Sequence, residues 1–332
     1  MEFLCLTSYI NQFLGTKFMI KEEFLNLLII GTGAYVCGTK KGDYGTILPA
    51  ILTYAKRFKQ KININFICNS EAGEKNAKEK SLILSQLIDT NQLVKFEFLV
   101  CFGEPDILFE KINIKNKIDS SIIAVPDNFH FKWISAMIKN QIPTLTVKPL
   151  TLNISEARKL RDLSEINKTP LFVEFHKRYD RQLRLARDIF ISGKLGIPLY
   201  SFTEYTQRKE IPMEAFKNWC SETNIFSYLG VHYVDALYYI TECKPIKVSS
   251  SGQKVFLKNQ GFNTFDSIQC SIIWEDQNKN LFNQIILSSW VESNLSSAIS
   301  KQDFNLIGTL GRVGCEQKER GVRFLSDISP TE

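Results

Sequence analysis

The chain has 332 residues, of which 44% are hydrophobic and 23% charged, a composition typical of globular proteins and a length that favours two domains. Its net charge of +6 comes from 41 basic and 35 acidic residues that form no long basic block, which argues against nucleic-acid binding. The eight cysteines include no C-x-x-C pair, so their spacing predicts reduced thiols and no metal site.

The first 23 residues are expected to form an N-terminal extension. Residues 1–18 are fairly apolar, but they lack the basic start, the sustained apolar core and the small-residue cleavage site of a signal peptide. No later segment offers about 20 uncharged apolar residues, so no membrane span is predicted. Together with the cysteine pattern, these features predict a cytoplasmic protein.

Residues 24–149 alternate short apolar runs with helix-like stretches, which predicts βαβ units and a parallel sheet. The predicted strands are 25–30, 62–68, 96–100, 121–125 and 144–147, and the predicted helices are 47–58, 74–88 and 130–139. This part is therefore predicted to be a doubly wound Rossmann domain.

Residues 150–332 are predicted to form a second domain of the α+β class. Asn153 is placed to cap a helix with Ile154, Ala157, Leu160 and Leu163 on one face, and a strand at 170–175 and a helix at 181–192 follow. The remaining predicted strands are 199–206, 246–256, 266–274, 284–291 and 303–307. Because few helices separate these strands, we expect a largely antiparallel, open sheet with one covered face.

A glycine turn follows the first strand. In Gly31-Thr-Gly-Ala-Tyr-Val36, two glycines permit a tight turn and let backbone N–H groups approach a pyrophosphate. The predicted cofactor contacts here are Gly31, Gly33, Ala34, Tyr35 and Val36. The third glycine of the dinucleotide fingerprint is missing, and residues 37–45 make the loop longer than usual. A purely structural turn is the alternative, but the position on the first strand of a βαβ series favours the dinucleotide.

Other strand tips carry further candidates for cofactor binding. Asn69 and Ser70 follow the second strand, where they either accommodate a 2′-phosphate near Lys75 or simply cap a helix, so NAD and NADP both remain open. Carboxyl ends of strands face the ligand crevice in such sheets, so Ala124, Val125, Pro126 and Asp127 are expected along the nicotinamide half. His130 follows, either as a cofactor contact or as a residue that only lines the helix start.

A lysine and a histidine are the best candidates for proton chemistry. Lys148 ends another predicted strand, and His232 lies in Gly230-Val-His-Tyr-Val-Asp, where a helix would place His232 and Asp235 on one face. These two side-chain types are suited to passing protons near neutral pH. The alternatives are a solvated lysine at a strand end and a core histidine bonded to a polar neighbour.

Taken together, these motifs resemble the Gfo/Idh/MocA family of nicotinamide-dependent oxidoreductases, from about Leu25 to Arg323. The matching segments are Gly31-Thr-Gly, Ile123-Ala-Val-Pro-Asp-Asn-Phe-His, Val147-Lys-Pro-Leu, Glu174-Phe-His-Lys-Arg-Tyr, Ser192-Gly-Lys-Leu-Gly-Ile-Pro, Gly230-Val-His-Tyr-Val-Asp and Gly308-Thr-Leu-Gly. The resemblance implies a Rossmann domain and a C-terminal domain whose open sheet forms a dimer or tetramer interface.

The resemblance also implies a reaction and its residues. Lys148 would contact substrate and nicotinamide and stabilise a developing alkoxide, and His232 would exchange the proton of the substrate hydroxyl. Hydride would move between NAD or NADP and a secondary alcohol or keto carbon of a sugar, a sugar derivative or a cyclitol. The implied substrate-side residues are Lys148, His176, Arg178, Tyr179, Tyr228, His232 and Asp235.

Two positions depart from the family pattern. Val147 stands where the family has a glutamate, and Tyr228 stands where an aspartate often precedes the histidine by four residues. Either Tyr228 replaces the aspartate as a proton donor, or the protein is a non-catalytic nicotinamide-binding regulator or scaffold. Few residues follow Gly308-Thr-Leu-Gly, which agrees with a truncated C-terminal domain as a further expectation.

Overall fold

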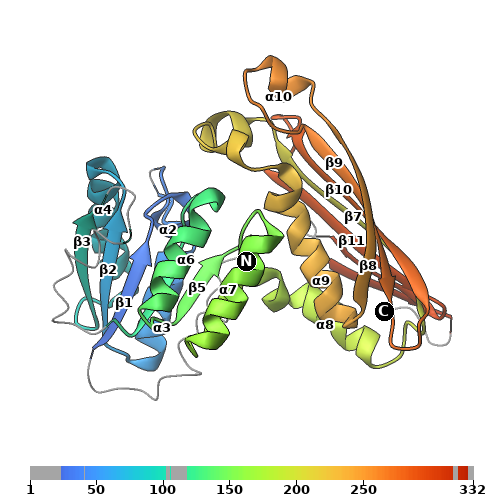
Figure 1. Ribbon diagram of the computed structural model, residues 1–332, viewed down its shortest axis with the longest axis horizontal. Helices are drawn as coiled ribbons and strands as arrows, with labels where there is room; N and C mark the ends of the chain where they lie inside the picture. Colours follow the sequence, from blue (N-terminus) through green and yellow to red (C-terminus); the bar gives the residue numbers. More distant parts are fainter. Residues whose placement is uncertain (1–23, 41, 102–104, 106–117, 317–320, 328–332) are drawn as a thin grey trace. The chain divides into compact units, whose positions relative to one another are not determined.

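The computed structural model describes residues 24–40, 42–101, 105, 118–316 and 321–327, and the chain divides into two compact units after His176 (Figure 1). The predicted N-terminal extension and residues 328–332, which bear on the expected truncation, lie outside the described residues. Within these ranges, no helix combines the length and the apolar composition that crossing a membrane requires.

The first unit is a parallel sheet with helices on both faces. Its strands are β1 (Leu25–Ile30), β2 (Ile62–Cys68), β3 (Val94–Val100), β4 (Ser120–Ile123), β5 (Thr144–Val147) and β6 (Leu171–Glu174). Its helices are α2 (Ala34–Cys37), α3 (Ile47–Phe58), α4 (Glu71–Ile88), α6 (His130–Lys139) and α7 (Ile154–Ile166), and the 3-10 turn η1 (Asp127–Phe129) precedes α6. The strand order β3-β2-β1-β4-β5-β6, parallel throughout, confirms the predicted doubly wound Rossmann sheet.

An apolar layer on each face of the sheet explains why its strands appear in the sequence as continuous hydrophobic runs. Leu27 and Ile29 of β1 pack with α3 and α4 on one face, whereas Leu28 and Ile30 pack with α6 and α7 on the other. Side chains alternate between faces along a strand, so a strand buried on both faces is apolar at every position. The predicted ends of β1, β2, β5, α3 and α6 are confirmed.

The structure differs from the sequence prediction at several places in this unit. Strand β3 begins at Val94 rather than at residue 96, and β4 spans Ser120–Ile123 rather than 121–125. Helix α4 begins at Glu71 rather than at residue 74, because the Ser70 hydroxyl accepts the N–H of Gly73 at 3.0 Å and caps the helix. Ile154 is 70% exposed although it was expected on the covered face of α7, where Leu160 is fully buried. Strand β6 pairs with β5, so the first unit extends to His176 rather than to residue 149.

The second unit is built on a larger sheet. Its strands are β7 (Pro198–Arg208), β8 (Lys244–Gln253), β9 (Ser267–Glu275), β10 (Leu281–Glu292), β11 (Ser300–Gly308), β12 (Gly311–Glu316) and β13 (Gly321–Ser326). Its helices are α8 (Arg181–Ile191), α9 (Val231–Thr241) and α10 (Phe256–Asn259), and its shorter helical turns are η3 (Ile211–Ala215), η4 (Cys220–Glu222) and η5 (Phe226–Gly230). The turn η2 (His176–Tyr179) lies at the division between the units.

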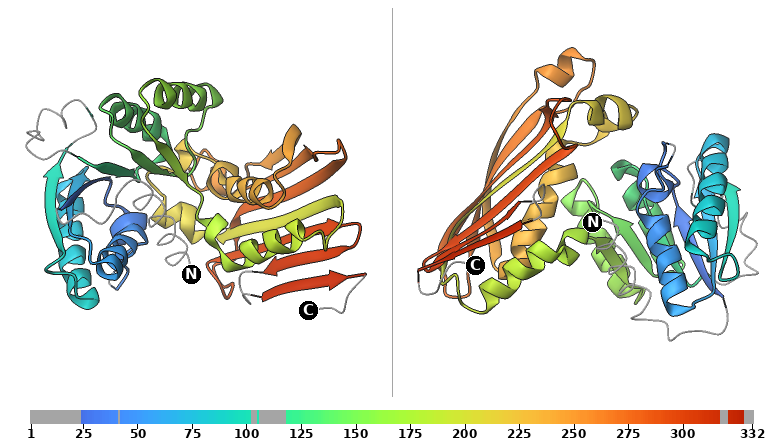
Figure 2. Two further views of the ribbon diagram at one scale, coloured as in Figure 1. Left: turned by 90° about the horizontal axis from the view of Figure 1, so that it is seen from below. Right: turned by 180° about the vertical axis from the view of Figure 1, so that it is seen from behind.

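The second sheet has one covered face, as predicted. Its order is β13-β12-β11-β7-β10-β9-β8, and neighbouring strands are antiparallel except for β7 and β10. That parallel pair arises because β7 inserts between β10 and β11, which follow it much later in the chain. Helices α8 and α9 lie on one face (Figure 2), over a core that includes Trp274, Trp290 and Phe304.

Strand β8 ends earlier than predicted, shortly before α10 begins. The run predicted to reach residue 256 stops at Gln253, because the chain turns into α10. The carboxylate of Asp266, which is 5% exposed, accepts the N–H groups of Val255, Phe256 and Leu257 at 2.6, 2.8 and 2.7 Å. These three donors would otherwise be unpaired at the start of a helix.

We expect Asp266→Ala to lower the free energy of unfolding by about 2 kcal/mol, because a charged helix cap is lost and its donors are left in a buried site. Urea denaturation followed by tryptophan fluorescence measures this change. Glu222→Ala, which removes an exposed carboxylate of the same unit, should change stability by less than about 0.5 kcal/mol. Equal effects in the two variants would contradict the capping role of Asp266.

Candidate cofactor and substrate sites

The predicted cofactor residues of the first unit lie at one edge of its sheet. All its strands run in the same direction, so their carboxyl ends share an edge. The segments that follow these ends are 31–33 after β1, 69–70 after β2, 124–127 after β4, 148–149 after β5 and 174–176 at the end of β6. In the strand order, β1 and β4 are the neighbours at which the chain reverses its winding, and ligands bind at this point in open α/β sheets.

The two glycines of the turn have different roles. Gly31 has φ +104°, and a Cβ there would lie 2.2 Å from the carbonyl oxygen of Ala124, so only glycine fits. Gly33 is exposed, and a Cβ there would meet nothing within 4 Å. The space beside Gly33 is therefore open to a ligand. Val36, predicted as a cofactor contact, is buried in the core of the unit.

The long loop after the turn is folded against α4. Lys80 is 6% exposed, and its ammonium donates to the carbonyl oxygens of Lys40 and Asp43, both at 2.6 Å, while lying 5.0 Å from the centre of the Tyr44 ring. Asn76 donates to the carbonyl of Gly38 at 2.9 Å. The loop is thus fixed by side chains of the next crossover helix, a contact that its sequence did not predict.

After β2, Ser70 caps a helix, which is one of the two roles that the sequence left open for it. Its hydroxyl accepts the N–H of Gly73, as described above, whereas Asn69 is exposed. Thr32, between the two glycines, was not singled out in the sequence. It is 6% exposed, and its hydroxyl oxygen lies close enough that a Cβ on Gly73 would meet it at 3.0 Å. The glycine turn and the start of α4 are therefore in close packing contact.

His130 is held inside the first unit. The ring is fully buried, with Nδ1 2.7 Å from the carbonyl oxygen of Pro149 and Nε2 2.9 Å from that of Val125. Both ring nitrogens are thus engaged by main-chain groups. The ring braces the strand ends that carry Val125 and Lys148, which fits the structural alternative for His130 rather than a direct cofactor contact.

A buried acid and histidine end β6. Nδ1 of His176 lies 2.9 Å from Oε1 of Glu174, and both residues are more than nine-tenths buried. His176 was expected on the substrate side, but its carboxylate neighbour was not predicted. Because β6 ends at Glu174 and His176 begins η2, strand alternation did not predict this contact.

In the second unit, Arg178 and Asp235 form a two-pronged ion pair. Nε of Arg178 donates to Oδ2 of Asp235 at 2.8 Å, and its terminal nitrogen donates to Oδ1 at 2.5 Å. Burial raises the pKa of Asp235, and the hydrogen bonds and charge of Arg178 act in the opposite direction. This pair ties η2 to α9, so Arg178, which was expected on the substrate side, braces this turn.

His232 lies on α9, one turn before Asp235, and is 3% exposed. Its ring centre is 6.3 Å from that of Tyr205 on β7. Tyr179, the third member of the predicted substrate-side segment, is half-buried, and burial raises its pKa. The structure therefore places His232 in a buried aromatic setting.

Lys177 is a buried cation that sequence reasoning missed. It is 2% exposed, its ammonium contacts Oε1 of Gln302, and it lies 5.6 and 5.9 Å from the ring centres of Tyr205 and Tyr233. The Tyr233 hydroxyl donates to the same Gln302 oxygen at 3.2 Å. Lys177 stands between His176 and Arg178 in the sequence, where a lysine normally faces solvent. No local signal in the sequence therefore revealed its burial.

Tyr228 belongs to an aromatic cluster. Its ring centre lies 4.9 Å from Phe216, 5.9 Å from Trp219 and 5.8 Å from Trp290. Phe216 and Trp219 lie between the turns η3 and η4. The ring of Tyr228 is therefore fixed from several sides.

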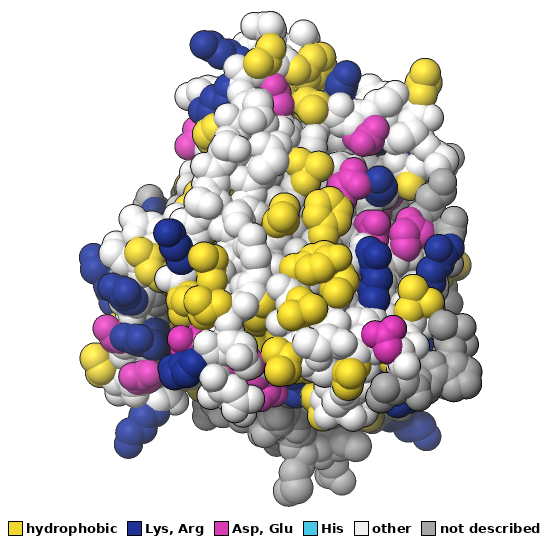
Figure 3. All heavy atoms as spheres, turned by 90° about the vertical axis from the view of Figure 1, so that its right-hand side faces the viewer, with side chains coloured by type: hydrophobic (Ala, Val, Ile, Leu, Met, Phe, Trp, Pro, Cys, Tyr) yellow, Lys and Arg dark blue, Asp and Glu magenta, His cyan; other side chains and the backbone are white. Residues whose placement is uncertain are grey.

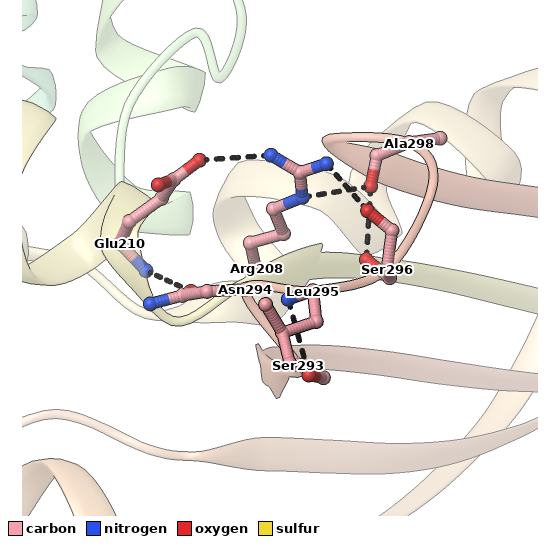
Figure 4. Close-up of polar contacts among 7 residues, drawn as sticks. All are labelled: Arg208, Glu210, Ser293, Asn294, Leu295, Ser296 and Ala298. Atoms are coloured by element: carbon pink, nitrogen blue, oxygen red, sulfur yellow. Dashed lines mark hydrogen bonds and ion pairs between the residues drawn. The ribbon is translucent and has the colours of Figure 1, made fainter.

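Arg208 holds the loop between β10 and β11 (Figure 4). Its guanidinium donates to the carbonyls of Ser296 and Ala298 at 2.5 and 3.1 Å and lies 3.2 Å from the carboxylate of Glu210. The N–H of Glu210 in turn donates to the side chain of Asn294 at 3.0 Å. All guanidinium nitrogens are occupied within the protein, so Arg208 orders this loop.

Comparison with known sequences adds an independent line of evidence. Residues 25–175 match the model of a family described as an oxidoreductase family with an NAD-binding Rossmann fold, GFO_IDH_MocA. Rhizopine catabolism protein MocA of Rhizobium meliloti is 28% identical over 129 residues, which are 39% of this chain and 40% of that protein. An inositol 2-dehydrogenase of Rubrobacter xylanophilus is 31% identical over 85 residues, 25% of this chain and 24% of that protein. The matches thus span less than half the length of these curated relatives.

Comparison with solved structures extends the likeness to both units. An inositol dehydrogenase homologue from Azotobacter vinelandii, crystallised with NADH and myo-inositol, superposes with a TM-score of 0.69. The alignment covers 94% of this chain and 75% of that chain at 15% sequence identity, so it establishes the fold. The family match thus covers the first unit, residues 25–175, and the structural likeness shows that both units share the fold of that homologue.

Proposed function

We propose that the protein is an oxidoreductase that uses NAD or NADP to transfer a hydride to or from a secondary alcohol or keto carbon of a sugar, a sugar derivative or a cyclitol. The observation that carries this proposal is the placement of the Gly31–Gly33 turn and Lys148 at the same carboxyl edge of one parallel sheet. The relatives named for inositol dehydrogenation support the substrate class.

The first unit fits a dinucleotide at this edge. The space beside Gly33 is open, and Lys80, which holds the carbonyls of Lys40 and Asp43, adds positive charge near the expected phosphates. Ala34 and Asn69 are exposed beside the turn and at the β2 tip, and Ala124 and Val125 are half-buried at the β4 tip. We propose these residues as the cofactor contacts, with Tyr35, Ser70, Pro126 and Asp127 completing the site.

Lys148 and His232 carry the proposed chemistry. The ammonium of Lys148 stabilises negative charge on the substrate oxygen, an effect that is strong in a site shielded from water. His232 accepts or returns the hydroxyl proton, and Tyr228 is the second candidate for this step. On the substrate side, His176, Arg178, Tyr179 and Asp235 shape the site, with Arg178 and Asp235 acting through their mutual ion pair.

A nicotinamide-binding regulator or scaffold without turnover is the second candidate. The packing of Tyr228 among Phe216, Trp219 and Trp290 favours it, because an aromatic side chain so enclosed already has a structural role. The two candidates share cofactor binding and differ in turnover, so binding and activity have to be measured separately.

We expect Gly33→Ala to weaken binding of NADH or NADPH by about tenfold or more, equivalent to about 1.4 kcal/mol, while leaving stability unchanged. The added methyl group meets no protein atom but occupies space that a phosphate needs. Titration followed by cofactor fluorescence, with each cofactor in turn, measures the affinity and the preference between them.

Gly31→Ala is the contrasting variant for this test. Its Cβ collides with the Ala124 carbonyl, so this variant should lower stability as well as binding. Unchanged affinity in Gly33→Ala, for a wild-type protein that binds, would refute the placement of the phosphates at this turn.

We expect Lys148→Met to lower kcat by about 100-fold on whichever cyclitol or sugar is turned over, with cofactor affinity changed much less, because charge stabilisation matters most in the transition state. Formation of reduced nicotinamide across a panel of cyclitols and sugars provides the assay. Lys139→Met, at the exposed end of α6, is the matched control and should retain full activity. Cofactor binding without turnover of any panel member would favour the regulator.

The open face of the second sheet supports self-association. Figure 3 shows hydrophobic side chains gathered across this face, where the cross-strand partners Phe202 and Ile285 are 38% and 45% exposed and Tyr200 is 49% exposed. The nearest charged pair, Glu204 and Lys301, is internally neutralised at 2.6 Å. A two-fold axis places a patch against its own copy, and this neutral, apolar centre suits that arrangement. We therefore propose a homo-oligomer formed through this face.

We expect wild type to be at least dimeric and Phe202→Asp plus Ile285→Asp to be monomeric, because the substitutions would bury like charges against each other. Light scattering coupled to gel filtration measures the mass. Leu87→Asp, at an exposed apolar position of α4, should leave the mass unchanged. A monomeric wild type, or an unchanged mass in the double variant, would exclude this interface.

A further inference from the structure

Strand β8 ends the strand order of the second sheet and is exposed along its whole length. It pairs with β9 on one side, and within the described ranges no strand pairs with its outer side. Every residue from Lys244 to Gln253 is exposed. An end strand of this kind presents main-chain N–H and C=O groups with which an extended segment of another chain can pair. This edge of the sheet is therefore open to an added strand.

A hollow of about 410 Å³ lies beside this edge. Its lining includes residues of β8 and β9 and two phenylalanines, namely Val248, Ser250, Gly252, Ile268, Phe226 and Phe265. A Cβ on Gly252 would lie 2.6 Å from the Phe265 ring, so a residue without a side chain lets this ring approach the strand. The three β8 residues alternate along the strand and share one face. An added strand would place every second side chain on that same face.

The hollow favours an apolar side chain. Two of its polar residues, Asn224 and Ser227, bind each other: the Asn224 amide donates to the Ser227 hydroxyl at 3.0 Å, and the Ser227 N–H donates to Asn224 Oδ1 at 2.9 Å. Val248, at the edge of the hollow, is 64% exposed, and its register partner on β9 is the buried Ile272. The apolar layer of the sheet thus reaches solvent here, and an apolar side chain would cover it.

Positive charge lies along the same strand. Lys244, Lys247 and Lys254 are exposed, and within the described part of the chain none of them forms an ion pair. The acids that flank β8 and β9 are already paired, because Glu242 and Glu275 lie 2.9 and 2.7 Å from basic side chains of their own. An edge with unpaired cations and paired acids is complementary to an acidic partner.

The cations and the hollow lie on opposite faces of the sheet. Lys247 directly precedes Val248, and neighbouring residues of a strand point to opposite faces. Its register partner Ile273 likewise alternates with Ile272 on β9. A strand added to this edge would therefore meet the lysines with one set of alternate side chains and the hollow with the other.

We propose that β8 and the hollow bind an extended segment of another protein in which acidic residues alternate with apolar ones. Main-chain hydrogen bonds to β8 supply affinity, and the hollow and the lysines supply specificity. A second copy of β8 does not fit, because pairing two such strands would bring their lysines together. This inference depends on neither cofactor binding nor turnover.

The probe is a capped, fluorescently labelled peptide of eight residues in which glutamate alternates with valine. Its matched counterpart has lysine in place of glutamate. We expect the acidic peptide to bind the full-length protein at least tenfold more tightly than the basic one, as measured by fluorescence anisotropy. Failure of the acidic peptide to bind, or equal affinity for the two peptides, would overturn the proposal.

The charge of β8 should decide this preference. Lys244→Glu plus Lys247→Glu is expected to reverse it, whereas Lys139→Glu plus Lys159→Glu, at exposed positions of the first unit, should leave it unchanged. A change of equal size in the two double variants would show general attraction to a basic protein and would contradict a site at β8. Val248→Asp should weaken binding of the acidic peptide at least fivefold, because it puts a like charge at the hollow.

Hydrogen exchange followed by mass spectrometry locates the bound peptide. Main-chain hydrogen bonds from an added strand should slow exchange of amides in residues 244–253. Binding of the acidic peptide with unchanged exchange in this segment would place it elsewhere and would also overturn the proposal. Because wild type is compared with and without peptide, this measurement does not depend on how any variant folds.

Discussion

The approach of Gly31 to the Ala124 carbonyl is the constraint on which the cofactor side of this protein depends. β1 lies between β2 and β4, with the N–H of Gly31 donating to Ile67 at 3.0 Å and the N–H of Ala124 donating to Ile30 at 2.9 Å. A side chain at Gly31 would push against β4 and break this continuity. Because the register is fixed here, the polar residues after each strand are brought to a common edge.

One loop in each unit is ordered by a positively charged side chain bound to main-chain carbonyls. Lys80 binds two carbonyls of the long loop, and Arg208 binds two carbonyls of the β10–β11 loop. A carbonyl accepts hydrogen bonds from a buried cation but leaves its charge in place, whereas a carboxylate would neutralise that charge. On the proposed function, the charge retained by Lys80 favours the negative phosphates of the cofactor.

The sequence predicted the first unit better than the second for a physical reason. Strands such as β1 and β2 are buried on both faces and can therefore be recognised in the sequence as continuous apolar runs. Strands of the second sheet have one open face, so their ends are harder to predict: β8 was predicted at 246–256 rather than at Lys244–Gln253, and β12 and β13 were missed. The parallel pairing of β7 with β10 depends on strand insertion and has no local signal.

The same distinction applies to the candidate sites. Positions at strand tips were predictable because the parallel sheet itself brings them together. Glu174 and Lys177 were not singled out, because their importance depends on burial; Lys177 reaches Gln302, 125 residues later in the chain. For Tyr228, the sequence revealed a departure from the family pattern but not the aromatic cluster that encloses its ring.

The pairing of Arg178 with Asp235 determines which residues of α9 remain available for chemistry. Helical spacing brought His232 and Asp235 together in the prediction, which left the carboxylate as a possible partner for the histidine. In the structure, both carboxylate oxygens accept hydrogen bonds from Arg178, so the acid is committed to bracing η2 against α9. A carboxylate held in a two-pronged pair is a poor proton carrier, because protonating it would sacrifice a charge-assisted bond. On the proposed function, proton transfer from this helix therefore falls to His232, and the ion pair contributes by fixing the helix that carries this histidine.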